Sequence, residues 1–226
     1  MATTALLERA RKESWSDEQL VEYVLAGDAS LYELLMRRYN GRLYRIVRAI
    51  LRDDSDTEEV MQSAYMRAYQ HLADFAGRAK FSTWLTRIAV HEAFACYRRK
   101  RMFQPLDNRE ESLSRGVLKP LASTGRTPEE KTYDRELGDV LEKAILGLPK
   151  GYRLVFILRD VEEMSTEEAA QCLNLSQENV KVRLHRARAA LRNELCAKAG
   201  ATTLQCFHFD ASRCDRVVES VLKLAA

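Results

Sequence analysis

The segment from Val180 to Arg192 combines residue types that bind polyanions. It carries five lysine and arginine residues and no acidic residue. Lysine and arginine neutralise phosphates, and side chains in the first turns of a helix can reach base edges in a major groove. The same pattern fits a solvated basic face on an ordinary amphipathic helix, and Arg183 also fits a position beneath the helix. The candidate DNA contacts are Gln177, Lys181, Arg183, His185 and Arg186.

The residues before this segment predict a helix-turn-helix within residues 148–195. Ser165 and Glu168 form a capping-box pattern, in which a hydroxyl and a carboxylate each accept a free amide of the first turn. Asn174 suits a left-handed turn, and Ser176 is placed to cap the next helix. Helical spacing turns one set of residues inward, namely Val180, Leu184, Ala187 and Leu191. The capped short helix, the tight turn and the basic second helix together favour DNA binding.

A second basic stretch, from Ala76 to Gln104, interleaves cations with aromatic residues. It holds seven lysine and arginine residues against a single acid, Glu92. Aromatic rings stack on unpaired bases while cations hold the phosphate backbone, so the pattern fits a surface for single-stranded DNA. Phe81 and Trp84 fit a place in the core equally well. The candidate contacts are Arg78, Lys80, Trp84, His91, Arg98 and Arg99.

An acidic stretch, from Asp53 to Glu59, opens another predicted helix. Acids in a first turn interact favourably with the helix dipole, which accounts for their position but not for five carboxylates. Docking on a basic surface of a partner protein is the second role that we predict for them. The candidate partner contacts are Asp54, Asp56, Glu58, Glu59 and Gln62.

Composition argues for a helix-rich protein without enzymatic motifs. The 226 residues are 46% apolar and 31% charged, with nine glycines, four prolines and a net charge of +3. The first residues lack the apolar core of a signal peptide, and no apolar run approaches membrane-spanning length. We therefore expect a cytoplasmic protein without membrane insertion. No phosphate-binding loop, nucleophile elbow or metalloenzyme motif is present, so we expect neither an enzyme nor a cofactor.

The cysteines are five in number and scattered, which does not indicate a disulfide framework. Cys206, His208 and Cys214 lie close together near the C-terminus, where thiolate and imidazole ligands would suit zinc. Three ligands at this spacing fit no standard zinc finger. A docked helix anchored by Phe207 and Phe209 is the favoured interpretation, so we expect no metal.

Apolar periodicity and turn residues predict an all-α chain of two helical domains. Capping-box patterns begin helices at Ser16 and Ser55, and Gly200 is expected to end the basic helix. Residues 105–127 contain proline, glycine and serine without helical periodicity, and they predict a flexible linker. The predicted domains are therefore residues 1–104, a helical bundle, and residues 128–198, the helix-turn-helix domain. A short helical extension follows over residues 199–226.

These segments together resemble the extracytoplasmic-function (ECF) group of bacterial sigma factors, within the sigma-70 family. The resemblance covers roughly residues 16–196 and is most specific in FSTWLTRIA and VKVRLHRARAAL. It implies that the acidic helix docks on core RNA polymerase and that residues 75–101 read and open the −10 promoter element. It implies that the helix-turn-helix reads the −35 element. An anti-sigma protein and a stress- or signal-responsive regulon are further expectations.

Two positions depart from the pattern of that family. His91 stands where the family usually has asparagine, and the turn at Asn174 lacks the glycine that is common there. The preferred promoter bases are therefore not predicted. The competing interpretation is a two-domain DNA-binding regulator that acts without polymerase, and dependence of promoter binding on core polymerase distinguishes the two.

Overall fold

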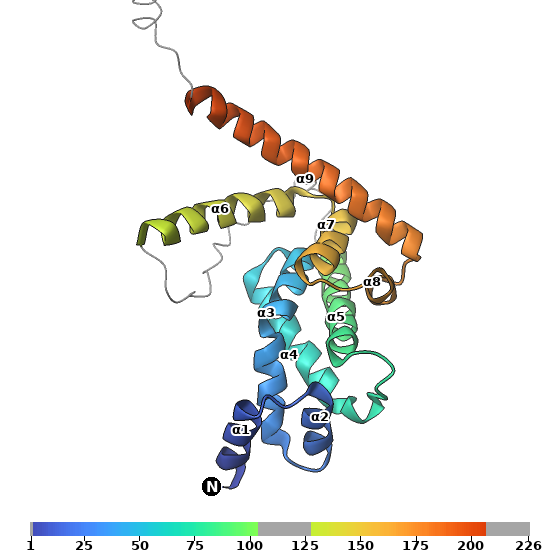
Figure 1. Cartoon of the computed structure of the whole chain (residues 1–226). Coiled ribbons are helices and arrows are strands. Elements are labelled where there is room, and N and C mark those ends of the chain that lie inside the picture. Colours follow the sequence, from blue (N-terminus) through green and yellow to red (C-terminus); the bar gives the residue numbers. More distant parts are fainter. Residues whose placement is uncertain (1, 104–127, 207–226) are drawn as a thin grey trace, which may run out of the picture. The chain divides into compact units, whose positions relative to one another are not determined.

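The computed structural model describes residues 2–103 and 128–206, and every regular element in these stretches is a helix, which confirms the all-α class (Figure 1). The first stretch contains α1 (Ala2–Lys12), α2 (Asp17–Leu25), α3 (Tyr32–Leu51), α4 (Asp54–Gln70) and α5 (Phe81–Phe103), with 3-10 turns η1 (Ala29–Leu31) and η2 (Leu72–Asp74). The second contains α6 (Pro128–Gly147), α7 (Lys150–Phe156), the π-helical turn η3 (Ile157–Val161), α8 (Thr166–Leu173) and α9 (Gln177–Cys206).

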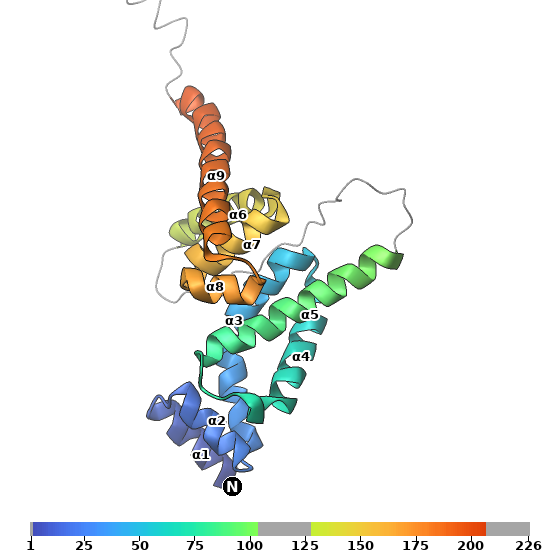
Figure 2. The same cartoon turned by 90° about the vertical axis from the view of Figure 1, so that its right-hand side faces the viewer.

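Helices α3, α4 and α5 pack against one another as a bundle (Figure 2). Each helix places its apolar residues on one stripe, because a helix returns to the same face every three to four residues. Burying one large aliphatic side chain contributes about 1.5–3 kcal/mol, and this burial drives the packing. Completely buried members of the core are Leu43, Ile46, Ala64, Leu85 and Ala89.

The start of α2 confirms the first predicted capping box. The Ser16 hydroxyl accepts a hydrogen bond from the Gln19 backbone at 3.3 Å, and the Gln19 side chain accepts one from the Ser16 backbone at 2.9 Å. Trp15 and Leu20 are buried on either side of the cap. The local sequence therefore sets both the start of α2 and the direction in which the chain enters it.

Helix α8 and the first turns of α9 form the predicted helix-turn-helix. Ser165 and Glu168 make both hydrogen bonds of the second capping box, at 3.1 and 2.7 Å. Asn174 ends α8 with φ of 52°, in the left-handed region that the turn requires. The Ser176 hydroxyl accepts from the Asn179 backbone at 3.2 Å and so caps α9. The residues predicted to face inward, Val180, Leu184, Ala187 and Leu191, are buried.

Two predicted helix boundaries are wrong. Asp53, not Ser55, caps α4: its carboxylate accepts from the Asp56 backbone at 2.9 Å, and Ser55 lies inside the first turn. Aspartate is as good an N-cap as serine, so the earlier residue takes the position. Gly200 does not end α9, which continues to Cys206. A glycine costs a helix only about 1 kcal/mol relative to alanine, too little to stop one flanked by alanines.

Contacts group residues 1–188 into one compact unit and the chain from Ala189 onward into another. Within the first unit, α3 packs against α7 and η3, and α5 packs against α8. One hydrophobic core therefore continues from Ile46 of α3 to Val155 of α7 and Ala169 of α8. None of the helices in the described ranges is long and apolar enough to span a bilayer.

Candidate DNA and polymerase interfaces

The outward face of α9 carries most of the predicted contacts with duplex DNA. Lys181 and His185 are exposed on the side of α9 away from its buried residues, and Gln177 is exposed in the first turn. Arg186 is also exposed, and it donates a hydrogen bond to the Tyr152 hydroxyl at 3.3 Å. Four of the five predicted side chains are therefore accessible: Gln177 in the first turn, and Lys181, His185 and Arg186 on the outward face, where each can reach phosphate or base edges.

Two further residues of α9 refine this face. Arg188 is bound to Asp160 through two hydrogen bonds of 2.8 and 2.7 Å, so a carboxylate of its own chain already neutralises it. Val182 is 48% exposed beside Lys181. An exposed apolar side chain on such a helix can contact the methyl group of thymine. The sequence did not predict a DNA contact for Val182, because the candidate contacts were chosen for charged and polar side chains.

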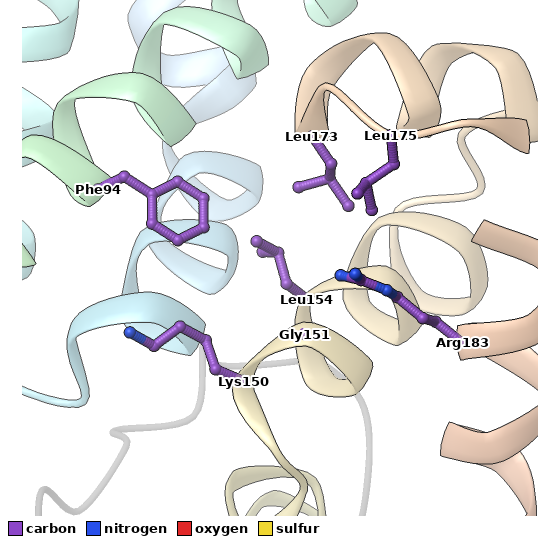
Figure 3. A pocket seen from close by; sticks show the side chains of 7 residues that line it. All are labelled: Phe94, Lys150, Gly151, Leu154, Leu173, Leu175 and Arg183. Carbon is purple, nitrogen blue, oxygen red and sulfur yellow. The ribbon is translucent and has the colours of Figure 1, made fainter. Parts of the chain in front are cut away.

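Arg183 differs from the other predicted contacts on α9. It is partly buried and lines a pocket of about 210 Å³ that extends to Phe94 of α5 (Figure 3). Its Nη1 lies 3.1 Å from the place that a Cβ on Gly151 would take. The absence of a side chain at Gly151 is what allows this approach, and the alternative position beneath the helix is the one observed. The full lining is Phe94, Lys150, Gly151, Leu154, Leu173, Leu175 and Arg183.

The aromatic residues around the start of α5 divide between core and surface. Phe81 is 1% exposed and belongs to the core. Trp84 is partly buried, and its ring centroid lies 5.5 Å from Phe75 and 5.6 Å from Phe81. This cluster fixes Trp84 at the surface of the bundle with part of its ring accessible.

The predicted cations near α5 are all accessible. Arg78 and Lys80 are exposed in the loop before α5, and Lys80 lies 3.5 Å from Glu168 of α8. His91 is exposed on α5. Arg98 and Arg99 are exposed one to two turns before its end. The aromatic cluster and these cations therefore border the same helix, as a surface for single-stranded DNA requires.

The acidic residues of α4 have three different environments. Asp54 accepts a hydrogen bond from the Tyr44 hydroxyl at 2.9 Å and pairs with the buried Arg48 at 2.6 Å. Asp56 pairs with Lys100 of α5, and this hydrogen bond raises the pKa of Lys100. The three other predicted partner contacts are exposed, and their side chains make no hydrogen bond or ion pair with another described residue, namely Glu58, Glu59 and Gln62.

Met66 extends this exposed face by one turn. It is 59% exposed, four residues after Gln62 and seven after Glu59. Sequence reasoning missed it because a methionine inside a helix is usually core. Its spacing from the two polar residues was the signal that could have placed it on the same face.

The candidate metal site of Cys206, His208 and Cys214 does not lie wholly within the described part of the chain. Cys206 is the last residue of α9, whereas His208 and Cys214 lie outside the described residues. Among the side chains that the structure does describe, no group of three histidine, cysteine or acidic residues is arranged to hold a metal.

Comparison with protein families matches two segments of the chain. Residues 35–102 match sigma-70 region 2, and residues 138–191 match sigma-70 region 4. The first segment contains α4 and α5 with the acidic face and the aromatic cluster. The second contains the helix-turn-helix.

Relatives over most of the chain agree with these matches. The ECF RNA polymerase sigma factor SigW of Bacillus subtilis is 32% identical over 77% of this chain and 94% of its own. The ECF RNA polymerase sigma-E factor of Escherichia coli is 31% identical over 81% of this chain and 96% of its own. The solved structure of the sigma factor RpoE with the anti-sigma factor NepR, from Bartonella quintana, has the same fold. It covers 73% of this chain and 96% of its own at 21% identity, with a TM-score of 0.57. The chain therefore belongs to the ECF sigma factors, which bind core RNA polymerase and promoter DNA and initiate transcription.

Proposed function

We propose that α9 binds the −35 duplex through Gln177 in its first turn and through Lys181, His185 and Arg186 on its outward face. The observation that carries this proposal is that all four side chains are exposed in the first turns of α9, whereas Val180, Leu184 and Ala187 between them are buried. Lysine and arginine would contact phosphates and set the register, and residues of the first turns would read bases. Arg183 joins this set only if it leaves its place beside Gly151.

The start of α5 and its preceding loop read and open the −10 element in this proposal. Trp84 offers a partly exposed ring for a base that has left the stack, at a cost of a few kcal/mol for unstacking. Exposed cations then hold the displaced strand, and a histidine takes a base-reading position. These residues are Arg78, Lys80, His91, Arg98 and Arg99.

The exposed face of α4 docks on core polymerase. Glu58, Glu59 and Gln62 are available for a basic partner surface, and Met66 adds an apolar contact. Asp54 and Asp56 already have cationic partners in Arg48 and Lys100, so their contribution is to hold α4 in place as much as to touch polymerase.

The remaining parts of the proposal concern the whole protein. Residues 1–104 form the polymerase-docking and −10 domain, 105–127 the linker, 128–198 the −35 domain and 199–226 an extension. The chain performs no catalysis of its own, since polymerase supplies the chemistry, and it acts in the cytoplasm. The anti-sigma factor bound to RpoE supports a partner of that kind here, which would restrict initiation to a stress- or signal-responsive regulon.

Footprinting of the assembled holoenzyme on a promoter fragment tests the assignment of α9. Arg186→Ala should weaken protection of the −35 element and reduce the salt dependence of binding by about one counterion. Arg188→Ala is the matched control, because it removes an arginine two positions away that is bound to Asp160. Equal effects of the two substitutions would refute the proposed face.

A further inference from the structure

The first turn of α9 holds an acidic side chain on the face that is proposed to meet DNA. Glu178 is exposed in that turn, four residues before the exposed Val182. Residues four apart lie on the same side of a helix, one above the other. The buried residues of these turns, Val180 and Leu184, lie on the other side. Glu178 and Val182 therefore stand near the middle of the outward face, and His185 follows one turn after Val182.

Glu178 has no cation among the described residues to neutralise it. Lys181 lies three residues later, at a spacing that allows an ion pair on a helix. The side chain of Glu178 nevertheless makes no ion pair or hydrogen bond with another described residue. Arg188, by contrast, is held by Asp160. The carboxylate of Glu178 thus meets DNA with both of its oxygens open to a donor.

A carboxylate close to phosphates weakens DNA binding unless a donor on the DNA satisfies it, because like charges repel. Stabilisation of the helix start is the other role of an acid in a first turn, and this role needs no contact with DNA. The two roles have different consequences for affinity. An acid that only interacts with the helix dipole lowers affinity for every sequence alike, whereas an acid that accepts a hydrogen bond from a base lowers affinity only for sequences that lack the donor.

The major groove offers two amino groups as donors, one on cytosine and one on adenine. On adenine, the N7 acceptor lies beside the amino group, and its lone pair repels a carboxylate. Cytosine presents its N4 amino group with no acceptor on the same base edge. A carboxylate that enters the major groove from the first turn of α9 therefore favours cytosine over the other three bases.

We propose that Glu178 is a specificity-determining residue that accepts a hydrogen bond from N4 of a cytosine in the −35 element. The protein then prefers a C·G pair at one position, and Val182 contacts the methyl group of a thymine at a separate position nearby. This role rests on the proposed binding of α9 to the −35 duplex and deepens it by naming a base. Lys181 and Arg186 supply affinity through phosphates, and Glu178 supplies discrimination between sequences.

Selection by the holoenzyme from a promoter library randomised in the −35 element tests this role. The unmodified protein should select cytosine at one position. Glu178→Gln should shift the preference at that position toward adenine, because a glutamine amide bonds to N6 and N7 of adenine together. Glu178→Ala should abolish the preference. Its affinity for the selected sequence should fall about tenfold, and its affinity for the same sequence without that cytosine should not fall.

Glu167→Gln is the matched control for the change in charge. It neutralises an exposed glutamate in the first turn of α8, so it should leave every base preference unchanged. Glu178 is itself exposed, so neither of its substitutions removes a buried contact.

The outcomes separate this role from the proposed function of α9. If both Glu178 variants bind all −35 sequences more tightly and keep the base preferences of the unmodified protein, the acid serves only the helix start. Base reading by Glu178 is then excluded, while −35 binding by α9 stands. An unmodified protein that selects no cytosine, or a Glu167→Gln protein that loses the same preference, would also exclude it. An unmodified holoenzyme without any base preference in the −35 element would refute the proposed function of α9 itself.

Discussion

Arg153 donates a hydrogen bond from Nε to the backbone oxygen of Ala49 at 2.7 Å, across the seam between α7 and α3. Ala49 lies in the last turn of α3, where backbone oxygens have no partner within their own helix. Nη1 of the same arginine donates to the oxygens of Leu146 and Leu148 at 2.6 and 3.3 Å. With 1% exposure, Arg153 is a buried cation that satisfies the ends of two helices at once.

Replacement of Arg153 by methionine should lower the free energy of unfolding by about 2–4 kcal/mol. Methionine fills much of the volume but donates no hydrogen bond, so buried carbonyl groups lose their partners. Urea denaturation followed by circular dichroism measures the change. A loss below about 0.5 kcal/mol would contradict the role given to this arginine.

Substitution of Asp53, the observed N-cap of α4, should lower stability more than substitution of Ser55, the N-cap predicted from the sequence. Asp53→Ala should cost about 1 kcal/mol of stability, because the Asp56 amide loses its acceptor. Ser55→Ala should change stability by less than about 0.5 kcal/mol, since Ser55 lies inside the first turn. Thermal or urea unfolding of the two variants side by side measures both, and the reverse order would restore Ser55 as the cap.

Arg183→Ala should affect stability more than DNA binding. Its guanidinium packs against Gly151 rather than standing on the outward face of α9. We expect a loss of about 1 kcal/mol in unfolding free energy from lost packing, and a smaller decrease in −35 affinity than Arg186→Ala causes. Calorimetry and holoenzyme binding to a promoter fragment report the two quantities. A larger binding defect for Arg183→Ala would show that this side chain moves onto DNA.

Glu168 should make stability depend on pH in the acidic range. Burial acts to raise the pKa of Glu168, but hydrogen bonds from the Ser165 backbone and from Thr83 outweigh it, so the pKa lies below the ordinary 4.5. Because the folded state favours the carboxylate, its contribution is present above the unfolded pKa and is lost as pH falls through the folded pKa. Glu168→Gln should therefore be less stable at neutral pH and lose less stability on acidification.

Urea unfolding between about pH 3 and pH 7 measures this difference. Glu167→Gln is the control, since it removes a neighbouring exposed charge from the same helical turn. If the stability of Glu168→Gln and of Glu167→Gln depends on pH in the same way, the hydrogen bonds to the Glu168 carboxylate do not make folding depend on pH.

Charge reversal on α4 should weaken polymerase binding without unfolding the chain. Glu59→Lys places a cation against the basic surface that α4 is proposed to meet, so affinity for core should fall at least about tenfold. Glu22→Lys makes the same charge change on the exposed side of α2, outside that face. Anisotropy of labelled protein titrated with core polymerase measures both, and equal losses would indicate a general charge effect instead of a docking face.

Local signals made the helix starts predictable. Ser16 and Ser165 each had the matching residue three positions later, and both capping boxes are observed. Asn174 was identified by its tolerance of left-handed backbone, which it adopts. The prediction that Ser55 caps α4 was wrong because Asp53, an equally good N-cap residue, lies two positions earlier. Local rules succeed where one residue is the best donor or acceptor and fail where two compete.

Tertiary contacts explain what the sequence did not indicate. Glu162 has no motif around it, and the two arginines of α3 that donate hydrogen bonds to its carboxylate lie far away in the chain, so only the fold brings the three together. Arg183 and Arg186 are the same residue type three positions apart, yet Arg183 packs against Gly151 whereas Arg186 is exposed. On α4, Asp54 and Asp56 are paired whereas Glu58 and Glu59 are not, because Arg48 and Lys100 reach the two aspartates from other helices.

Transcription in vitro with bacterial core RNA polymerase on a promoter library tests the central claim most directly. We expect transcripts from a defined set of templates that appear only when the protein is added, with shared −35 and −10 sequences upstream of their start sites. The amount of these transcripts should fall when the protein carries Arg186→Ala or Glu59→Lys. Binding of the protein to duplex sites without any template-specific transcript would contradict a role in promoter selection and opening, and would indicate a regulator that acts without polymerase.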